Sequence, residues 1–285
     1  FSQAVGDLVR SSTSQQLDVD VLIVGAGPGG STAAYHLARH GLNVLMVEKA
    51  AFPREKVCGD GLTPRAVVQL RRLGIDTDDP RFERHGGLRI YSRRVTMELP
   101  WPDLDDFPPF GLMMTRSEFD ELLARHAEKA GARLMERTEA VAPIQDDGWV
   151  TGARIKSERD DAETTVRARF VIAADGSSSR FASRAGVRRD PAKPLGIAAR
   201  RYYRVERRPG PWLEVWMDLH EGDTILPGYG WLFPLADGSI NVGAGLLNTF
   251  RDFKDLSAQR VFDAFWRMLP PEWNVNEASA DGRVL

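Results

Sequence analysis

A glycine-rich run at residues 25–30, GAGPGG, has the spacing of a turn that binds a pyrophosphate. It follows the apolar segment VLIV and precedes a helical pattern, which is the context that this motif requires. There Gly25 permits a tight turn, Gly27 lets the backbone approach the phosphates, and Gly30 allows close packing of helix on strand. The free N–H groups at the start of the helix then face the negative charge. The run predicts a dinucleotide site, and the alternative is a glycine-rich turn without a ligand.

An acidic residue follows at the distance expected for a ribose contact. Glu48 ends the second apolar strand, 23 residues after Gly25, where a carboxylate would accept hydrogen bonds from ribose hydroxyls. The same carboxylate would repel a 2′-phosphate, so the predicted dinucleotide is FAD or NAD(H). A second turn lies at Asp175-Gly176, where an apolar strand ends and a serine-rich stretch leads into a helix.

The single cysteine, Cys58, lies in the loop FPREKVCGDGL after the second strand. One cysteine excludes an intramolecular disulfide and fits a reducing compartment. The loop is expected at the C-terminal edge of a parallel sheet, where open α/β folds bind ligands. Arg54 and Lys56 would favour the thiolate if they face it, and otherwise they are solvated loop charges.

The elements that position these residues alternate in character. Strands at 18–27 and 42–49 with a helix at 28–40 form a βαβ unit. Further helices are expected at 64–73, at 116–131 with Ser117 as N-cap, and at 256–269. Strand patterns dominate between residues 132 and 174 and again after residue 186.

This alternation predicts a discontinuous domain organisation. Residues 18–86 and 111–186 are assigned to an FAD-binding domain, and residues 87–110 and 187–285 to a β-rich substrate-binding module. Residues 1–17 are polar and are interpreted as a flexible leader. Because the chain starts with Phe and ends in mid-pattern, we expect both termini of the natural protein, and the C-terminal part of the fold, to lie outside these residues.

The composition is that of a soluble globular protein, with 42% apolar residues and a formal net charge of −2. Such a charge does not indicate a nucleic-acid-binding protein. The longest apolar stretch, VLIVGAG, is too short to span a membrane. His36 and His40 are four residues apart on the first helix, but no third ligand accompanies them, so no metal site is expected. Arginine pairs such as Arg200-Arg201 are expected to be solvated, with contact to a diphosphate or lipid headgroups as the alternative.

Several motifs together resemble the geranylgeranyl reductase family of FAD-dependent oxidoreductases, within the flavoprotein hydroxylase-like superfamily. Residues 54–59 match its R-x-K-x-C-G signature, and 229–234 match its Y-x-W-x-F-P pattern. Arg116 matches an FAD-contacting arginine, and VIAADGSSSRFA matches the second flavin motif. The resemblance covers about residues 18–250 and is strongest to actinobacterial menaquinone and geranylgeranyl reductases. It implies an α/β fold with a Rossmann-type FAD-binding domain and an inserted β-rich substrate domain.

The resemblance also implies roles for individual residues. Cys58 would lie beside the flavin ring as a proton donor, and the alternative is a small residue packed under the ring. Tyr229, Trp231 and Phe233 alternate along a strand and would line an apolar tunnel, unless they belong to the core. The residues expected to contact FAD are Gly25, Ala26, Gly27, Pro28, Gly29, Gly30, Glu48, Lys49, Arg54, Cys58, Gly59, Gly61, Arg116, Val141, Asp175 and Gly176.

The implied activity is reduction of carbon–carbon double bonds in a polyprenyl chain, carried by a geranylgeranyl group or menaquinone. NADPH, NADH or a ferredoxin would reduce the flavin, and the protein would be cytoplasmic or attached peripherally to the inner face of the cell membrane. Two other functions are possible on the same fold. One is an FAD monooxygenase or halogenase of an aromatic substrate, and the other is a non-catalytic lipid-binding role.

Overall fold

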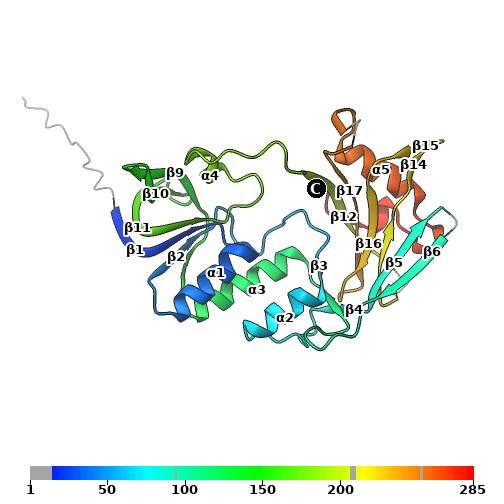
Figure 1. The fold of residues 1–285 in the computed structure, drawn as a ribbon, viewed down its shortest axis with the longest axis horizontal. Helices are drawn as coiled ribbons and strands as arrows, with labels where there is room; N and C mark the ends of the chain where they lie inside the picture. Colours follow the sequence, from blue (N-terminus) through cyan, green and yellow to red (C-terminus); the bar gives the residue numbers. More distant parts are fainter. Residues whose placement is uncertain (1–14, 94, 206–209, 251–252) are drawn as a thin grey trace, which may run out of the picture. The chain divides into compact units, whose positions relative to one another are not determined.

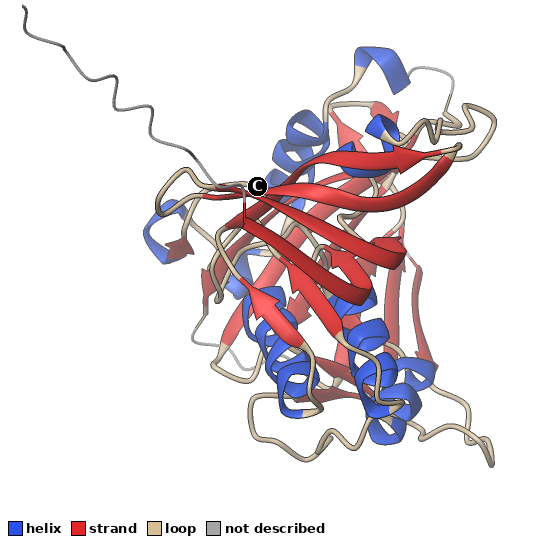
Figure 2. Ribbon diagram, turned by 90° about the vertical axis from the view of Figure 1, so that its left-hand side faces the viewer, coloured by secondary structure: helices blue, strands red, loops and turns tan. Residues whose placement is uncertain are grey.

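The computed structural model describes residues 15–93, 95–205, 210–250 and 253–285 (Figure 1). The chain divides into two compact units, each built from two separate stretches. The first unit contains Phe1–Phe52 and Asp120–Arg188, and the second contains Pro53–Phe119 and Arg189–Leu285. Each unit is built around a β-sheet, and Figure 2 draws the strands of these sheets in red.

A six-stranded sheet is the core of the first unit. Its order is β8 (Arg133–Met135), β2 (Val44–Val47), β1 (Gln15–Val24), β11 (Glu163–Ala173), β10 (Trp149–Ser157), β9 (Thr138–Asp146). The strands from β8 to β11 are parallel, and β10 and β9 continue the sheet antiparallel. Val21 to Val24 are at most 5% exposed, because a parallel sheet is covered on both faces and favours unbroken aliphatic runs.

The helices α1 (Pro28–Arg39) and α3 (Arg116–Lys129) lie side by side (Figure 1). The rings of Tyr35 and His126 stack between them with centroids 4.7 Å apart. The predicted N-cap of α3 was wrong by two residues. Thr115, not Ser117, precedes the helix, and its hydroxyl accepts a hydrogen bond from the Glu118 N–H at 3.3 Å. The Thr115 hydroxyl also donates a hydrogen bond to the Glu118 carboxylate at 2.7 Å, so the two residues stabilise the first turn of the helix.

A seven-stranded sheet dominates the second unit. Its order is β18 (Ala280–Asp281), β12 (Gly196–Arg204), β17 (Ser239–Leu247), β16 (Tyr229–Pro234), β13 (Trp212–Trp216), β5 (Gly87–Ser92), β6 (Val95–Pro100). Helix α5 (Ala258–Met268) packs on one face, where a Cβ at Gly230 would overlap the ring of Phe265. Trp216 and Leu232 belong to the same buried cluster as this helix. A short hairpin of β14 (Leu219–Glu221) and β15 (Thr224–Leu226) contributes Leu219 and Leu226 to this cluster.

A small sheet and one helix complete the second unit. The strands β3 (Gly61–Leu62) and β4 (Glu83–His85) pair with β7 (Gly111–Met113), and α2 (Pro64–Arg72) precedes β4. His85 is 1% exposed. The Trp101 indole N–H donates to His85 Nδ1 at 3.1 Å, and His85 Nε2 lies 3.3 Å from the carbonyl oxygen of Leu62.

The units divide the chain at other positions than those expected from sequence. Residues 53–86 and 111–119 group with the β-rich part, because β3 and β4 pair with β7 and β5 pairs with β13. Residues 15–17 of the predicted leader belong to β1, where Gln15 pairs with Thr164 of β11. The rest of the predicted leader lies outside the described residues. All four expected helices form within their predicted ranges.

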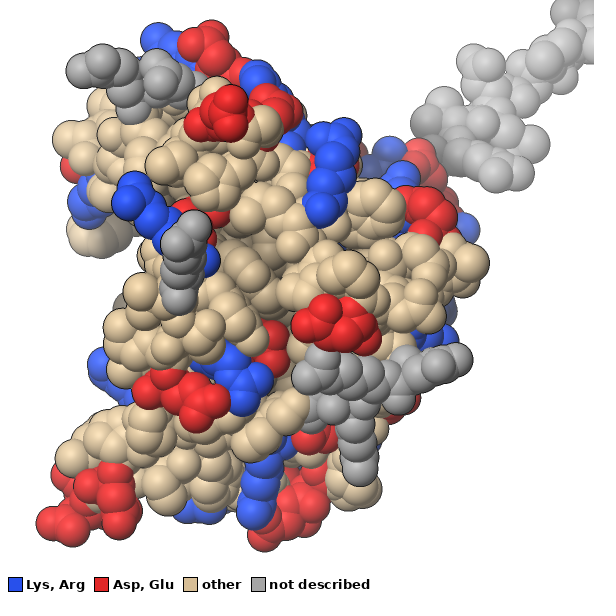
Figure 3. Space-filling model, turned by 90° about the vertical axis from the view of Figure 1, so that its right-hand side faces the viewer, with Lys and Arg blue, Asp and Glu red and all other residues tan. Residues whose placement is uncertain are grey.

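In the described part of the chain, no helix is long and apolar enough to cross a membrane. On the face drawn in Figure 3, basic and acidic side chains are interspersed rather than gathered by sign, in keeping with the formal charge of −2.

Candidate flavin and substrate site

In the first unit, the glycine turn lies directly against the second predicted motif. Gly25 has a φ of +96°, and a Cβ there would lie 2.6 Å from the carbonyl oxygen of Ala174. The Ala174 N–H donates to the Val24 carbonyl at 2.7 Å, which holds the two strand ends together. A Cβ at Gly30 would overlap the carbonyl oxygen of Gly25. Only glycine therefore fits these two positions, and the turn approaches its neighbours by backbone alone.

The first turn of α1 offers its N–H groups to a ligand. Gly27 precedes the helix in extended conformation, and no side chain of the described residues caps it. The first turn also contains no acidic residue. A helix start without a cap and without local negative charge is a suitable place for a phosphate group.

Glu48 joins the end of β2 to the glycine turn. Its carboxylate is 5% exposed and accepts hydrogen bonds from the N–H groups of Ala26 at 3.1 Å and Ala50 at 3.2 Å. The carboxylate thus shapes the turn in addition to the ribose contact that was expected from sequence.

Asp175 lies next to the glycine turn but directs its carboxylate to its own helix, α4 (Arg180–Arg184). It accepts hydrogen bonds from the Ser179 hydroxyl and from the Phe181 N–H, the latter at 3.2 Å. Gly176 has a φ of +98°. Asp175 and Gly176 therefore follow the end of β11 and turn the chain beside Gly25. A turn of this kind lets the backbone approach a pyrophosphate closely.

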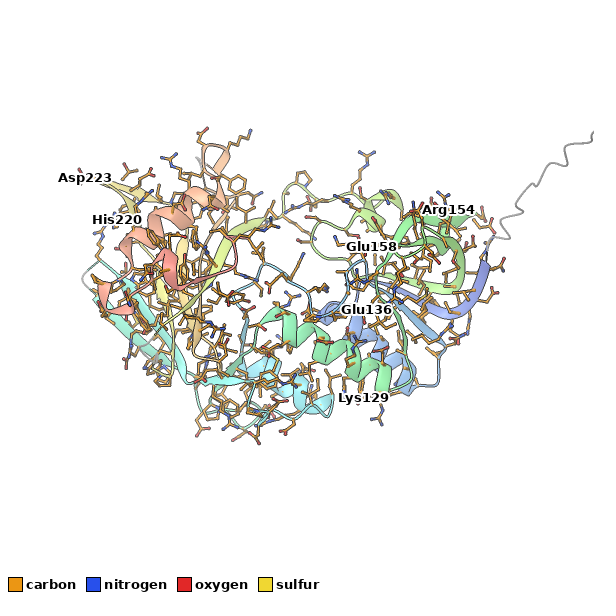
Figure 4. The ribbon with its side chains drawn as sticks, turned by 180° about the vertical axis from the view of Figure 1, so that it is seen from behind. Lys129, Glu136, Arg154, Glu158, His220 and Asp223 are labelled. Carbon is orange, nitrogen blue, oxygen red and sulfur yellow. The ribbon has the colours of Figure 1, made fainter. Side chains whose placement is uncertain are left out.

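Two other predicted cofactor residues lie farther along the same unit. Lys49 is exposed and lines an open cavity of about 660 Å³ together with Arg137 and Glu158, the latter labelled in Figure 4. Val141 lies half-buried on β9, and its carbonyl oxygen accepts a hydrogen bond from Arg184.

In the second unit, the Cys58 loop is held on one face of the seven-stranded sheet. The guanidinium of Arg200 binds the Glu55 carboxylate and donates to the Lys56 carbonyl at 3.3 Å. The Asn241 amide donates to the Cys58 carbonyl at 2.9 Å. Arg200 is 2% exposed, so the expectation that its arginine pair is solvated was wrong for this residue.

Asp60 is the buried centre of this arrangement, and sequence reasoning left it out of the site. Its carboxylate is 2% exposed and accepts hydrogen bonds from the Tyr202 hydroxyl and the Asn241 amide, both at 2.7 Å. The Arg116 N–H donates to it at 3.1 Å. Burial raises the pKa of Asp60 above its ordinary value of 3.8, and the bonds from Tyr202 and Asn241 oppose that rise. In the sequence, Gly-Asp-Gly indicates a turn at this position, and in the structure Asp60 takes a φ of +63°, which residues other than glycine adopt only in special turns.

The three aromatic residues of β16 share one face, as the alternation predicted. The ring centroids of Tyr229 and Trp231 are 5.7 Å apart, and those of Trp231 and Phe233 are 6.2 Å apart. Trp231 is 4% exposed, whereas Tyr229 is 44% exposed. Burial raises the pKa of Tyr229, and the nearby Cys58 adds to the rise.

Glycines let the loop and this aromatic face approach closely. A Cβ at Gly59 would lie 3.1 Å from the Phe233 ring, and a Cβ at Gly243 would overlap the Trp231 ring. Gly61 begins β3, where it pairs with Met113. Arg54 is half-buried in the same loop.

Comparison with protein families identifies the chain. The family described as FAD binding domain matches residues 18–222, which is most of the chain. The chain belongs to this FAD-binding domain family. Among the described residues of this FAD-binding protein, no group of three or more His, Cys, Asp or Glu is placed to hold a metal ion.

Curated relatives of this FAD-binding protein are named as reductases. It is 38% identical over 255 residues to the menaquinone reductase of Mycobacterium tuberculosis, an alignment that covers 89% of this chain and 61% of the relative. It is 36% identical over 228 residues to the digeranylgeranylglycerophospholipid reductase of Thermoplasma volcanium, covering 79% and 56%. These relatives confirm the predicted resemblance, and the chain spans about 60% of their length.

Solved structures confirm the fold class. A geranylgeranyl bacteriochlorophyll reductase-like protein from Thermoplasma acidophilum superposes with a TM-score of 0.73 at 31% identity, over 90% of this chain and 63% of that one. A myxobacterial chondrochloren halogenase superposes with a TM-score of 0.72 at 24% identity, over 93% and 61%. The second likeness shows the fold alone.

The residues of the first unit fit the pyrophosphate and ribose of FAD. The glycine turn provides a cradle that a Cβ would fill, the start of α1 provides N–H groups, and Glu48 provides a buried acceptor. When bound, FAD supplies a two-electron carrier that accepts and donates hydride. The contacts that the other predicted residues make with FAD stay predictions.

The Glu48→Gln variant should bind FAD about tenfold more weakly, because an amide has only one acceptor oxygen for the two N–H groups and loses the charge. Fluorescence titration of the apoprotein with FAD measures the effect. Glu158→Gln is the matched control, because the Glu158 side chain is 65% exposed. Equal affinity of Glu48→Gln and wild type would contradict a role of this carboxylate in the cradle.

Proposed function

We propose that this chain is part of an FAD-dependent ene-reductase that saturates carbon–carbon double bonds of a polyprenyl chain, carried by a geranylgeranyl group or a menaquinone. One observation carries the proposal. The Cys58 loop lies on the aromatic face of β16, where a Cβ at Gly59 would lie 3.1 Å from the Phe233 ring and 3.6 Å from the Trp231 indole nitrogen. The relatives named as menaquinone and digeranylgeranylglycerophospholipid reductases support the same substrate class.

The chemistry requires a proton at a defined place. Bound FAD, once reduced, would supply a hydride to one alkene carbon, so the protein must deliver a proton to the other carbon for the bond to be saturated. An isolated alkene is a poor hydride acceptor, and correct placement of the proton donor is therefore decisive. The Cys58 thiol donates this proton, becomes a thiolate and regains a proton from water. The flavin is oxidised and the alkene is reduced by the same two electrons.

The apolar chain contacts the aromatic face. Tyr229 and Phe233 are the accessible members, while Trp231 lies buried between them on β16 and packs its ring against Gly243 of β17. A face of rings without charges suits a hydrocarbon substrate.

NADPH, NADH or a ferredoxin reduces the flavin in this proposal. The protein is cytoplasmic, with peripheral attachment at the inner face of the membrane that holds its substrate.

The test uses the full-length protein loaded with FAD. The flavin is reduced anaerobically with NADPH, geranylgeranyl diphosphate or menaquinone is added, and mass spectrometry looks for products heavier by two hydrogens. Saturated product formed while the flavin reoxidises supports the proposal. A flavin that stays reduced until oxygen is admitted would overturn it and favour an aromatic monooxygenase or halogenase.

The Cys58→Ser variant should form saturated product at least about 100-fold more slowly, because a hydroxyl is a far weaker acid than a thiol and general acid catalysis is worth this much. The single-turnover rate of flavin reoxidation by the alkene measures the effect. FAD affinity should stay at the wild-type value, which separates a proton-donor role from packing under the flavin. A wild-type rate would remove Cys58 from the mechanism.

A further inference from the structure

A buried amide links the Cys58 loop to the aromatic face of the second unit. Asn241 is fully buried on β17 and pairs with Tyr202 of β12 on one side and Phe233 of β16 on the other. Its Oδ1 accepts a hydrogen bond from the Trp231 indole N–H at 2.9 Å. Its Nδ2 donates to the Cys58 carbonyl at 2.9 Å and to the Asp60 carboxylate at 2.7 Å.

The partners of Asn241 determine which way its amide points. An indole N–H is only a donor, so it must face the amide oxygen. A carbonyl and a carboxylate are only acceptors, so they must face the amide nitrogen. The reversed orientation would leave all three hydrogen bonds unmade inside a buried network, which is costly. The side chain therefore holds one orientation.

The loop depends on the Asn241 amide at Cys58, the residue that carries the thiol. Arg200 holds the start of the loop through Glu55 and Lys56, and Tyr202 holds Asp60. Between these anchors, Asn241 makes the side-chain hydrogen bond to the backbone of Cys58 itself. The bond fixes the peptide from which the thiol projects, and it fixes that peptide relative to Trp231.

We propose that Asn241 is a positioning residue for the reaction, which sets the place of the Cys58 thiol relative to the aromatic face on which the alkene lies. The inference rests on the proposed function, because it assigns a purpose to the position of Cys58. Asp60 shares the role by accepting the second N–H of the same amide. Neither side chain transfers a proton to the substrate.

The test measures the alkylation of Cys58 in the full-length protein, without and with bound FAD. Iodoacetamide labels the thiol, and mass spectrometry of the Cys58 peptide gives the rate between pH 6 and pH 9. In Asn241→Ala the loop loses a buried hydrogen bond, so the labelling rate should rise about fivefold to tenfold.

A matched asparagine separates positioning from stability. Asn248 lies just past the other end of β17, where its Oδ1 accepts the Leu195 N–H at 2.7 Å. Asn248→Ala should destabilise the same strand pair and leave the labelling of Cys58 unchanged. Trp231→Phe keeps the ring but removes the indole donor, so it should raise the labelling rate in the same direction and by less. This variant serves if Asn241→Ala does not fold.

Catalysis provides the second readout. Asn241→Ala should lower kcat for saturated product about tenfold with little change in KM, because the alkene still binds the aromatic face. Wild-type labelling of Cys58 in both Asn241→Ala and Trp231→Phe would overturn the inference. Faster labelling together with a fully active Cys58→Ser variant would instead contradict the proton-donor role and leave the positioning of the loop intact.

Discussion

A Gly30→Ala variant should lose nearly all affinity for FAD, whereas Gly29→Ala, which keeps the backbone N–H through which Gly29 is expected to contact FAD, should bind FAD normally. A Cβ at Gly30 would overlap the carbonyl oxygen of Gly25, so α1 would have to move away from the turn. The obstacle is backbone rather than a side chain that can rotate, and overpacking of this kind costs about 3 kcal/mol or more. This free-energy cost disfavours the conformation of the turn that binds FAD, so FAD affinity should fall by at least about 100-fold.

The neighbouring glycine provides the matched control for this change. A Cβ at Gly29 would have no atom within 4 Å, and the residue is exposed. Because Ala is a better helix former than Gly by about 1 kcal/mol, Gly29→Ala should be neutral or slightly stabilising. Fluorescence titration with FAD and thermal unfolding of both variants measure the contrast. Equal behaviour of the two variants would show that the packing of α1 on the turn does not govern the cradle.

Acidification from pH 7 to pH 4 should destabilise wild type by about 3 kcal/mol more than the His85→Gln variant. His85 is 1% exposed, and burial lowers its pKa from the ordinary 6.5 to about 4. Its Nδ1 accepts the Trp101 indole N–H, so protonation at Nδ1 would oppose a donor to a donor. The fold therefore requires the neutral ring.

The direction of the pH effect follows from that requirement. The unfolded chain takes up a proton near pH 6.5 and the folded chain only near pH 4. The stabilisation is complete above pH 6.5 and is lost as the pH falls from 6.5 towards 4. Gln keeps a donor and an acceptor but does not titrate, so the stability of the variant should vary less with pH. Because the variant lacks the buried imidazole ring, it should be less stable than wild type at pH 7. Urea unfolding at each pH measures the difference.

A second histidine shows whether the effect is specific. His220→Gln is the comparison variant, since the His220 side chain, labelled in Figure 4, is 35% exposed whereas His85 is buried. Parallel profiles for wild type and His85→Gln would mean that carboxylates alone account for the loss of stability in acid.

The cradle in the first unit could be predicted from sequence because its parts are close together in the chain. The strand, the glycine turn, the helix and Glu48 lie within some thirty residues, and each has a residue type that few other environments accept. The family resemblance implied that Asp175-Gly176 lies near the same pyrophosphate, and the parallel pairing of β1 with β11 is what places Asp175 against Gly25. Local spacing and steric necessity are sufficient for such a site.

The surroundings of Cys58 could not be predicted in the same way. Asn241 is 183 residues from Cys58 in the chain, and the strand SINVGAGLL that contains it reads like any buried strand. Asp60 has an acidic side chain in a glycine turn, which is common at exposed positions. Its burial depends on Tyr202 and Asn241, and both come from the distant sheet.

The segment Ala198 to Tyr203, AARRYY, shows what the sequence determined by itself and what it left open. Its two tyrosines and its place in a strand-rich stretch predict a strand, as the glycine turn predicts a dinucleotide cradle. Because each residue type occurs twice in succession, the two faces of that strand have the same composition, and no pattern tells which arginine faces the loop. Pairing with β17 decides it, placing Arg200 and Tyr202 beside Glu55 and Asp60. Residue types specify which chemistry is available, and only the register of distant strands brings it to one place.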